Sequence, residues 1–307
     1  MARVLVTGAN GFAGRAICRR LRAQGWQVRG SVRSAEAAVA DDIEKVVTGD
    51  IGADTDWRPA LAEVDAVVHC AARVHVLRET AGDPMAAYRE VNVAGSRRLA
   101  EQAVAAGLRR FVFLSSIGAA VAAAAPARAT PYQRSKLEAE AALRAATAGS
   151  ATRLVMLRPP LVYGPGAPGN FARLLRLIRA GRPLPLGCVD NRRSVLFIGN
   201  LADAVAAALQ VESAAAEPLA LADAEAVSTA ELARRIGRAC GRPARLLPVP
   251  VFLLRLAGTL AGRGATVDAL TGDLTIDNAA IQEALGWAPP FTLDQGLAET
   301  CAAEAAR

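Results

Sequence analysis

Short apolar runs rich in β-branched residues alternate with longer Ala- and Arg-rich stretches over the first 160 residues. Six of these runs have the length and composition of strands: RVLVT, WQVRGSV, EKVVTGD, DAVVHCA, RRFVFLS and TRLVMLR. The stretches between them are long enough for helices, and strands separated by helices pair in parallel through right-handed crossovers. The pattern predicts an α/β fold with a doubly wound parallel sheet, whose binding crevice lies at the carboxyl ends of the strands.

The alternation ends after LRPP (residues 157–160), where Pro and Gly become frequent. We therefore expect a sheet domain over residues 1–160 and a smaller, mixed α/β C-terminal lobe over residues 161–307, with segments that interleave near the boundary. The lobe is expected to hold five helices, near residues 170–180, 200–212, 228–240, 250–261 and 277–285. The Ala-rich segment 119–129 is compatible with either a helix or a mobile loop.

The composition, the first residues and the most apolar segment indicate a globular protein without a membrane-spanning helix. With 307 residues, of which 52% are hydrophobic, the chain can bury a large core. MARVLV leads directly into an apolar run without a charged leader or cleavage site, which favours a cytoplasmic protein. The most apolar late segment, residues 248–262, is shorter than the ~20 residues of a spanning helix and contains Arg255, so it predicts a buried or surface-lying helix.

The cysteines show no pattern of a metal or redox site. Five are scattered along the chain, without a CxxC pair and without a His at ligand spacing: Cys18, Cys70, Cys188, Cys240 and Cys301. Their spacing predicts free thiols in a reducing compartment and no metal site.

The net charge of +7 favours an anionic partner. Nucleic acid, a phosphate-bearing cofactor and a phosphorylated substrate all fit this sign. Aromatic residues make up only 4% of the chain and do not interleave with the arginines. The stacking platform of a nucleic-acid binder is therefore missing, which argues against nucleic acid.

The stretch TGANGFAG directly follows the first predicted strand and opens a helical pattern. Its glycines are spaced every three residues, at Gly8, Gly11 and Gly14. Such spacing allows a tight turn, close backbone approach to phosphates and tight packing of helix on strand. The helix amino terminus then receives the pyrophosphate, as in a Rossmann-type dinucleotide site, with Asn10 and Phe12 as further candidate contacts. The alternative is a simple tight connection between strand and helix.

The end of the second strand helps to choose the dinucleotide. An acidic residue there accepts the ribose hydroxyls of NAD, whereas an Arg accommodates the extra phosphate of NADP. The stretch GSVRS offers Arg33 and no acid, so NADP is favoured over NAD. The alternative is that Arg33 is an ordinary solvated residue. Asp50 and Ile51 close the third strand beside the adenine, and the small Ala71 and Ala72 after the fourth let the cofactor lie against the sheet.

Tyr132 and Lys136 begin a strongly helical stretch and project from one face, because they are four residues apart. A nearby ammonium favours the phenolate, so the pair can exchange a proton with an alcohol oxygen while hydride moves to or from a nicotinamide. Taken alone, this spacing is typical of an exposed helix pair. Ser115 and Ser116 end the fifth strand, where a hydroxyl can hold a substrate oxygen, unless they only form a strand-ending turn.

Six stretches occur in the order TGANGFAG, HCAA, VNVAG, FLSS, YQRSK and LRPPLVYGPG. In this order they resemble the extended short-chain dehydrogenase/reductase family, over essentially the whole chain. Its members include nucleotide-sugar epimerases, dehydratases and 4-ketoreductases. The resemblance implies that Tyr132 is the acid/base, that Lys136 binds the nicotinamide ribose and tunes Tyr132, and that Ser116 is the catalytic serine. It also implies a supporting role for Asn92 and a cofactor contact at Pro159.

The C-terminal lobe is similar to the branch of the family that acts on UDP-linked sugars. The similarity rests on GNFARLLRLIRAGRPLPLG and NRRSVLFIGNLADAV. It places Arg193 on the substrate pyrophosphate, where a guanidinium makes charge-assisted bidentate contacts, with Asn170 as a neighbouring polar contact. The alternative for Arg192 and Arg193 is a solvated pair before a strand.

Two departures from the family pattern leave several functions open. The connection from Ser116 to Tyr132 is short, and the acid after the second strand is absent. The resemblance implies a UDP-sugar 4-epimerase or a UDP-4-keto-sugar reductase, for a UDP-linked hexose or N-acetylhexosamine in surface polysaccharide biosynthesis. The other hypothesis is a non-catalytic NADP-binding sensor or scaffold. The family also implies a homodimer, paired through helices near residues 83–106 and 131–147.

Overall fold

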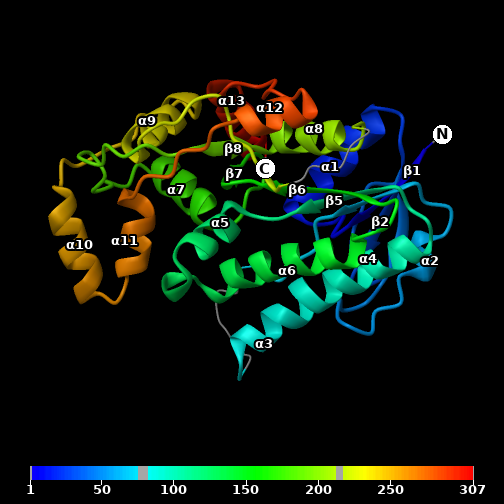
Figure 1. Cartoon of the computed structure of the whole chain (residues 1–307). Coiled ribbons are helices and arrows are strands. Elements are labelled where there is room, and N and C mark those ends of the chain that lie inside the picture. The colour runs from blue at the N-terminus through cyan, green and yellow to red at the C-terminus, as the bar shows by residue number, and fades with distance from the viewer. Residues whose placement is uncertain (1, 75–81, 212–216, 307) are drawn as a thin grey trace. The chain divides into compact units, whose positions relative to one another are not determined.

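A computed structural model describes residues 2–74, 82–211 and 217–306 (Figure 1). By contacts the chain divides into two units. The first comprises residues 1–160, 201–221 and 279–288, and the second comprises residues 161–200, 222–278 and 289–307. The expected division into a sheet domain over residues 1–160 and a smaller lobe over residues 161–307, with interleaving segments, stays a prediction.

Seven strands form the sheet of the first unit in the order β3-β2-β1-β4-β5-β6-β9. Their bounds are Arg3–Thr7 (β1), Gln27–Val32 (β2), Glu44–Val47 (β3), Ala66–His69 (β4), Arg110–Leu114 (β5), Arg153–Arg158 (β6) and Leu219–Ala220 (β9). Every pairing between neighbours is parallel. The predicted doubly wound sheet is therefore confirmed, and its strand order reverses between β1 and β4, where ligands bind in folds of this kind.

Helices cover both faces of this sheet (Figure 1). The unit contains α1 (Phe12–Ala23), α2 (Arg58–Leu61), α3 (Pro84–Arg89), α4 (Gly95–Ala105), α5 (Ile117–Ala124), α6 (Pro131–Thr147), most of α8 (Ile198–Ala208) and α12 (Ala279–Leu285). In Figure 1, α4 and α6 lie on one side of the strands and α1 and α8 on the other. Leu99 of α4 and Leu143 of α6 are fully buried against Leu5, Val67 and Phe111 of the strands. This layer of apolar contacts fixes the helices that carry the candidate site residues.

Two segments between the strands have special helical geometry. A π-helical turn, Glu90–Ala94, joins α3 to α4 and contains the buried Asn92. The Ala-rich segment, for which the sequence allowed a helix or a loop, forms α5 and then a 3₁₀ turn at Pro126–Arg128. Ser116 caps α5 by accepting a hydrogen bond from the backbone N–H of Gly118 at 3.1 Å.

The second unit is mainly helical. It contains β7 (Leu161–Tyr163), α7 (Gly169–Arg179), β8 (Val195–Phe197), α9 (Thr229–Ala239), α10 (Val251–Leu260), α11 (Gly264–Thr271) and α13 (Leu293–Ala305). Strands β7 and β8 pair in parallel, and α9 packs against both α7 and α13. Helices α11 and α13 were not foreseen from the sequence. None of the helices in the described ranges is long and apolar enough to cross a membrane.

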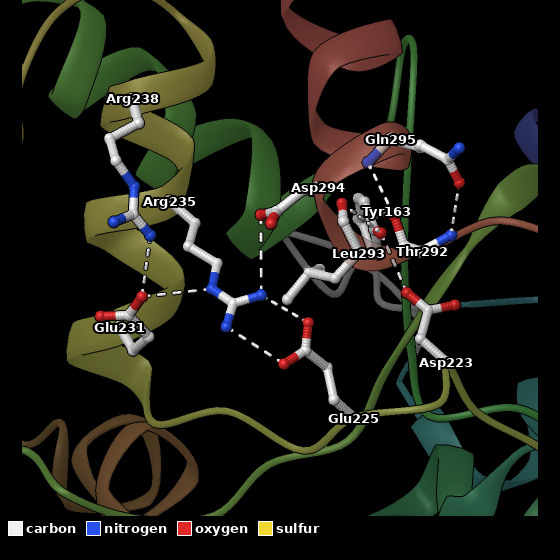
Figure 2. Close-up of polar contacts among 10 residues, drawn as sticks. All are labelled: Tyr163, Asp223, Glu225, Glu231, Arg235, Arg238, Thr292, Leu293, Asp294 and Gln295. Atoms are coloured by element: carbon white, nitrogen blue, oxygen red, sulfur yellow. Dashed lines mark hydrogen bonds and ion pairs between the residues drawn. The ribbon is translucent and has the colours of Figure 1, made fainter.

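Arg235 of α9 ties three segments of the second unit together (Figure 2). Its guanidinium pairs with Glu225, with Glu231 at 3.1 Å and with Asp294 of α13 at 3.6 Å. Nearby, the phenol of Tyr163 donates to the carboxylate of Asp223 at 2.9 Å. The side chain of Arg235 is only 18% exposed, but Asp294 is 71% exposed, so solvent screens the link from α9 to α13 more than the pairs with Glu225 and Glu231.

A disulfide joins Cys240, at the end of α9, to Cys301 of α13. The expectation of five free thiols is therefore wrong for this pair, while Cys18, Cys70 and Cys188 are free. The two cysteines are 61 positions apart in the sequence, and only the packing of α9 on α13 brings their Cα atoms to 5.2 Å. That separation lies in the usual range for a disulfide.

Candidate functional site

The glycine turn that joins β1 to α1 leaves no space for a side chain at Gly14. Gly8 has a φ of +65°, which favours glycine, and its carbonyl accepts a hydrogen bond from the N–H of Gly11 at 2.9 Å. A Cβ on Gly14 would lie 2.1 Å from the oxygen of Gly8. Even alanine therefore clashes there, and α1 begins directly above the end of β1.

The amino terminus of α1 is open to an anion. Gly11 is its N-cap and offers no side chain, and the first turn carries no acidic residue. Asn10 and Gly11 are exposed, and Phe12 is half-buried. The unsatisfied N–H groups and the helix dipole at this end favour a phosphate or carboxylate.

The neighbouring strand ends bring together the other candidate cofactor residues. A Cβ on Gly8 would lie 3.1 Å from the Cα of Ala71, so the loops after β1 and β4 touch, and Ala72 follows half-buried. Beyond β2, Arg33 Nε lies 3.1 Å from Asp50 Oδ1, and the two side chains are 81% and 89% exposed. Ile51 follows Asp50 and is half-buried.

Lys136 of α6 is buried, and its Nζ donates to the carbonyl of Leu114 at 2.7 Å. Nζ also lies 4.4 Å above the ring of Phe113. Burial lowers the pKa of Lys136 to about 8, against the influence of Cys70 and Glu140, which raises it. The ammonium is thus held at the carboxyl end of β5 by a carbonyl and a ring face.

Tyr132 lies one helical turn before Lys136 on α6, and its phenol interacts with the side chain of Ser116. Burial raises the pKa of the Tyr132 phenol, and the hydrogen bond with Ser116 lowers it by less. The expected lowering of this pKa by Lys136 is not found, because the ammonium is directed to Leu114 and Phe113 instead. The structure does bring Ser116, Tyr132 and Lys136 together.

Glu140, which the sequence analysis missed, continues this face of α6 one turn beyond Lys136. It is fully buried and accepts two hydrogen bonds from Arg158, at the end of β6, at 2.8 and 2.5 Å. The hydroxyl of Ser115 donates to the same carboxylate at 2.5 Å. Through Ser115 and Arg158, Glu140 therefore connects α6 to the ends of β5 and β6. The four-residue spacing of Tyr132, Lys136 and Glu140 is the sequence pattern that could have indicated Glu140.

Pro159, directly after Arg158, is also buried, and its carbonyl accepts the N–H of Ile117 at 2.9 Å. The loops after β5 and β6 are thereby joined beside Ser116. This contact places Pro159 in the same cluster as the serine and tyrosine.

Asn92 supports the start of α6 from the π-helical turn. Its amide donates to Ser135 Oγ at 2.9 Å and to the carbonyl of Arg73 at 3.0 Å, and its oxygen accepts the N–H of Arg73 at 2.7 Å. Ser135 Oγ in turn donates to the carbonyl of Tyr132 at 2.8 Å. Asn92 is thus linked to the backbone of Tyr132 through the hydroxyl of Ser135.

His69, at the end of β4, is fully buried between two hydroxyls. Nδ1 lies 2.7 Å from Thr7 Oγ1, and Nε2 lies 2.9 Å from Ser96 Oγ. Burial, and to a lesser degree Lys136, lowers the pKa of His69 to about 3. The ring is therefore neutral at ordinary pH and joins β1, β4 and α4 beneath the glycine turn.

The two candidate substrate residues belong to the second unit. Asn170 is exposed in the first turn of α7. Arg193 is half-buried, and its guanidinium donates to the carbonyl of Gly272 at 3.0 Å. Burial lowers the pKa of Arg193, although Asp273 raises it.

Two further features of the described ranges concern metal binding and cavities. In the described ranges, no group of three or more His, Cys, Asp or Glu side chains is arranged for a metal ion. A cavity in the second unit is lined by Phe171, Leu175, Arg176, Arg179 and Glu304, and so involves neither Asn170 nor Arg193.

Comparison with known proteins identifies the family. Residues 4–221 match the family described as the NAD dependent epimerase/dehydratase family. A UDP-glucose 4-epimerase from Vibrio cholerae is 39% identical over 98% of this chain and 94% of its own length.

Two solved structures share the fold. The chain is similar to MoeE5 in complex with UDP-glucuronic acid and NAD, with a TM-score of 0.77, 25% identity and 99% of each chain covered. It is also similar to the UDP-N-acetylglucosamine 4-epimerase from Bacillus cereus, with a TM-score of 0.77, 19% identity, and coverage of 98% of this chain and 99% of the other. The resemblance inferred from the motifs is confirmed, and the chain belongs to the NAD dependent epimerase/dehydratase family.

Proposed function

We propose that the chain is a nucleotide-sugar 4-epimerase that acts at C4 of a UDP-linked hexose or N-acetylhexosamine. The observation that carries this proposal is the cluster of Ser116, Tyr132 and Lys136 at the end of β5, in the sheet that also bears the glycine turn. The name of the Vibrio cholerae relative supports the reaction type and the UDP-linked substrate. An acid/base tyrosine with a serine partner is what oxidation and re-reduction of an alcohol require.

Each residue of the cluster has a defined part in this proposal. Tyr132 Oη takes the proton of the C4 hydroxyl and later returns it, while the hydroxyl of Ser116 holds the same sugar oxygen. A bound nicotinamide would supply the hydride acceptor and donor. Lys136 would bind the nicotinamide ribose, and Asn92 keeps the helix start in place through Ser135. Burial raises the pKa of Tyr132, which suits the step in which its phenol returns the proton. The step in which Tyr132 takes the proton needs the phenolate, which the positive charge of a bound oxidised nicotinamide would favour.

The cofactor contacts follow the strand ends. The glycine turn, with Asn10 and Phe12, would receive the pyrophosphate at the amino terminus of α1. The other proposed contacts lie after β3, β4 and β6, at Asp50, Ile51, Ala71, Ala72 and Pro159.

Preference for NADP over NAD is the finer part of the proposal and rests on Arg33. Strand β2 ends without an acidic residue. Because Arg33 and its ion-pair partner Asp50 are both exposed, the Arg33 guanidinium could leave Asp50 and bind the ribose phosphate of NADP. The solved structure of MoeE5 is a complex with UDP-glucuronic acid and NAD, so the binding of the two dinucleotides to this chain needs a direct comparison. Replacement R33Q should weaken NADP binding about tenfold or more and leave NAD binding unchanged, since one charge-assisted contact to phosphate is lost. Equal loss for both dinucleotides would remove this preference.

Further parts of the proposal concern the substrate and the assembly. Arg193 and Asn170 would contact the UDP pyrophosphate, since a guanidinium pairs well with phosphate oxygens. A homodimer paired through the α3–α4 and α6 helices, a cytoplasmic location and a place in surface polysaccharide biosynthesis remain proposals from the sequence.

The decisive experiment is product analysis after incubation of the purified chain with UDP-glucose and, separately, UDP-N-acetylglucosamine. Formation of the C4 epimer without net consumption of nicotinamide supports the proposal. Y132F should abolish turnover, whereas Y88F removes a hydroxyl from a ring 6.3 Å away and should retain it. Net oxidation of NADPH by a UDP-4-keto sugar would instead make the chain a reductase. Dinucleotide binding with neither reaction would favour the non-catalytic alternative.

A further inference from the structure

Helix α10 of the second unit exposes a continuous apolar stripe. Phe252, Leu256 and Leu260 follow one another at intervals of four residues and are 68%, 56% and 81% exposed. Leu253, in the same stripe, is 42% exposed. Large apolar side chains grouped in this way on one helix mark an interaction surface, whereas single exposed ones are ordinary.

The opposite face of α10 is already covered. Gly258 is the buried residue of this helix, and a Cβ there would lie 2.5 Å from Val267 of α11. At 3.6 residues per turn, the four stripe residues fall within about 60° of the point opposite Gly258. Helix α11 therefore packs on the glycine face of α10, and the two helices lie side by side in Figure 1. The helical spacing places the stripe on the side of α10 away from this contact.

Within the stretch of sequence that contains the stripe all charges are positive, and the neighbouring α11 adds the exposed negative charge of Asp268 beside Arg255. Every charged residue between positions 242 and 263 is an arginine: Arg242, Arg245, Arg255 and Arg263. Arg255 lies within the helix and Arg263 just after it, and both are exposed. An ion pair joins Arg255 to Asp268 of α11 at 3.9 Å, and it is weak because both side chains are exposed.

An anionic lipid surface matches both properties. Interfacial helices bury an apolar face at the level of the acyl chains and place arginines among the headgroup phosphates. A second copy of the chain fits less well, because a two-fold pairing of α10 with itself would bring like-charged arginines together. With 10 residues, α10 is too short to span a bilayer, so it would lie along the surface.

We propose that the chain docks reversibly on anionic membranes through α10, with Phe252, Leu256 and Leu260 inserted and Arg255 and Arg263 at the headgroups. Docking would hold the whole enzyme beside sugars or acceptors that are anchored in the bilayer. The proposal is independent of the reaction assigned above, because it concerns a different surface.

Sedimentation of the full chain with vesicles tests this proposal. Binding is expected with phosphatidylglycerol mixed into phosphatidylcholine, and little binding with phosphatidylcholine alone. The triple variant F252S/L256S/L260S should lose binding, and R255Q and R263Q should each weaken it about fivefold. The matched control V47S changes an apolar residue of β3 that is 49% exposed and should bind as the unmodified chain does.

Three outcomes would overturn the proposal. The unmodified chain could stay in the supernatant with both kinds of vesicle, or the triple variant could bind equally well. The third is a change of oligomeric state, in which light scattering finds the unmodified chain dimeric and the triple variant monomeric. In that case α10 contacts a second copy. Circular dichroism of each variant checks that the exposed substitutions leave the helices intact.

Discussion

Replacement of Arg158 by methionine tests how α6 is held on the sheet. The substitution keeps an unbranched side chain but removes both hydrogen bonds, at 2.8 and 2.5 Å, that the guanidinium donates to Glu140. Glu140 is fully buried, and Arg158 is only 18% exposed at its side chain. Removal of one partner from a buried pair costs about 3–5 kcal/mol, because an uncompensated charge stays in the interior. We expect the lower part of this range, since Ser115 and the nearby charge of Lys136 partly compensate.

Urea unfolding followed by tryptophan fluorescence measures this loss. The three tryptophans, Trp26, Trp57 and Trp287, all belong to the first unit, so their signal reports the unit that contains the pair. With a slope of about 2–3 kcal/mol per molar urea, the midpoint should fall by roughly 1–2 M. The double variant E140Q/R158M should recover part of the loss, because the buried charge is gone.

Arg89→Met is the matched control. Arg89 also makes two hydrogen bonds, both 2.7 Å, to a glutamate of α6, Glu138, but its side chain is 58% exposed. Solvent screens this pair, so the midpoint should hardly change. If R158M shifted the midpoint no more than R89M does, or if the double variant were less stable than R158M, the argument from buried charge would be refuted.

Three further predictions follow from single features of the structure. Gly14→Ala puts a methyl group 2.1 Å from the oxygen of Gly8, so dinucleotide binding measured by calorimetry should be lost, whereas Gly82→Ala, with open space around it, should bind normally. His69 has its pKa lowered from 6.5 to about 3, so the unfolded state binds the proton first and stability should fall as pH drops from 6.5 to 3. In His69→Gln the free energy of unfolding should fall less between pH 6.5 and pH 3. An equal fall in both proteins would mean that other groups cause it. Reduction of the Cys240–Cys301 disulfide should destabilise the second unit by about 2–4 kcal/mol, seen by circular dichroism, and an identical melt with and without reductant would contradict this.

The sequence by itself determined the order of the strands in the chain, the parallel sheet, the glycine turn and the pairing of Tyr132 with Lys136 on one helix face. Each of these depends on residues that are close together in the chain. Strand periodicity, the absence of a Cβ at Gly8 and Gly14, and a four-residue helical spacing act locally, so a pattern of letters is enough to indicate them. The ordered motifs also identified the family, which the comparison confirmed.

Only the tertiary structure decided which distant residues meet. Glu140 and Arg158 are ordinary charged residues in the sequence, and burial between α6 and β6 makes them a structural pair. Cys240 and Cys301 have no motif in common and become bonded because α9 packs on α13. The pKa of Tyr132 rises although the sequence favoured a fall, because burial depends on everything packed around the phenol and the direction of Lys136 depends on Leu114. Contacts of this kind depend on how separate elements pack, and local spacing carries no information about that packing.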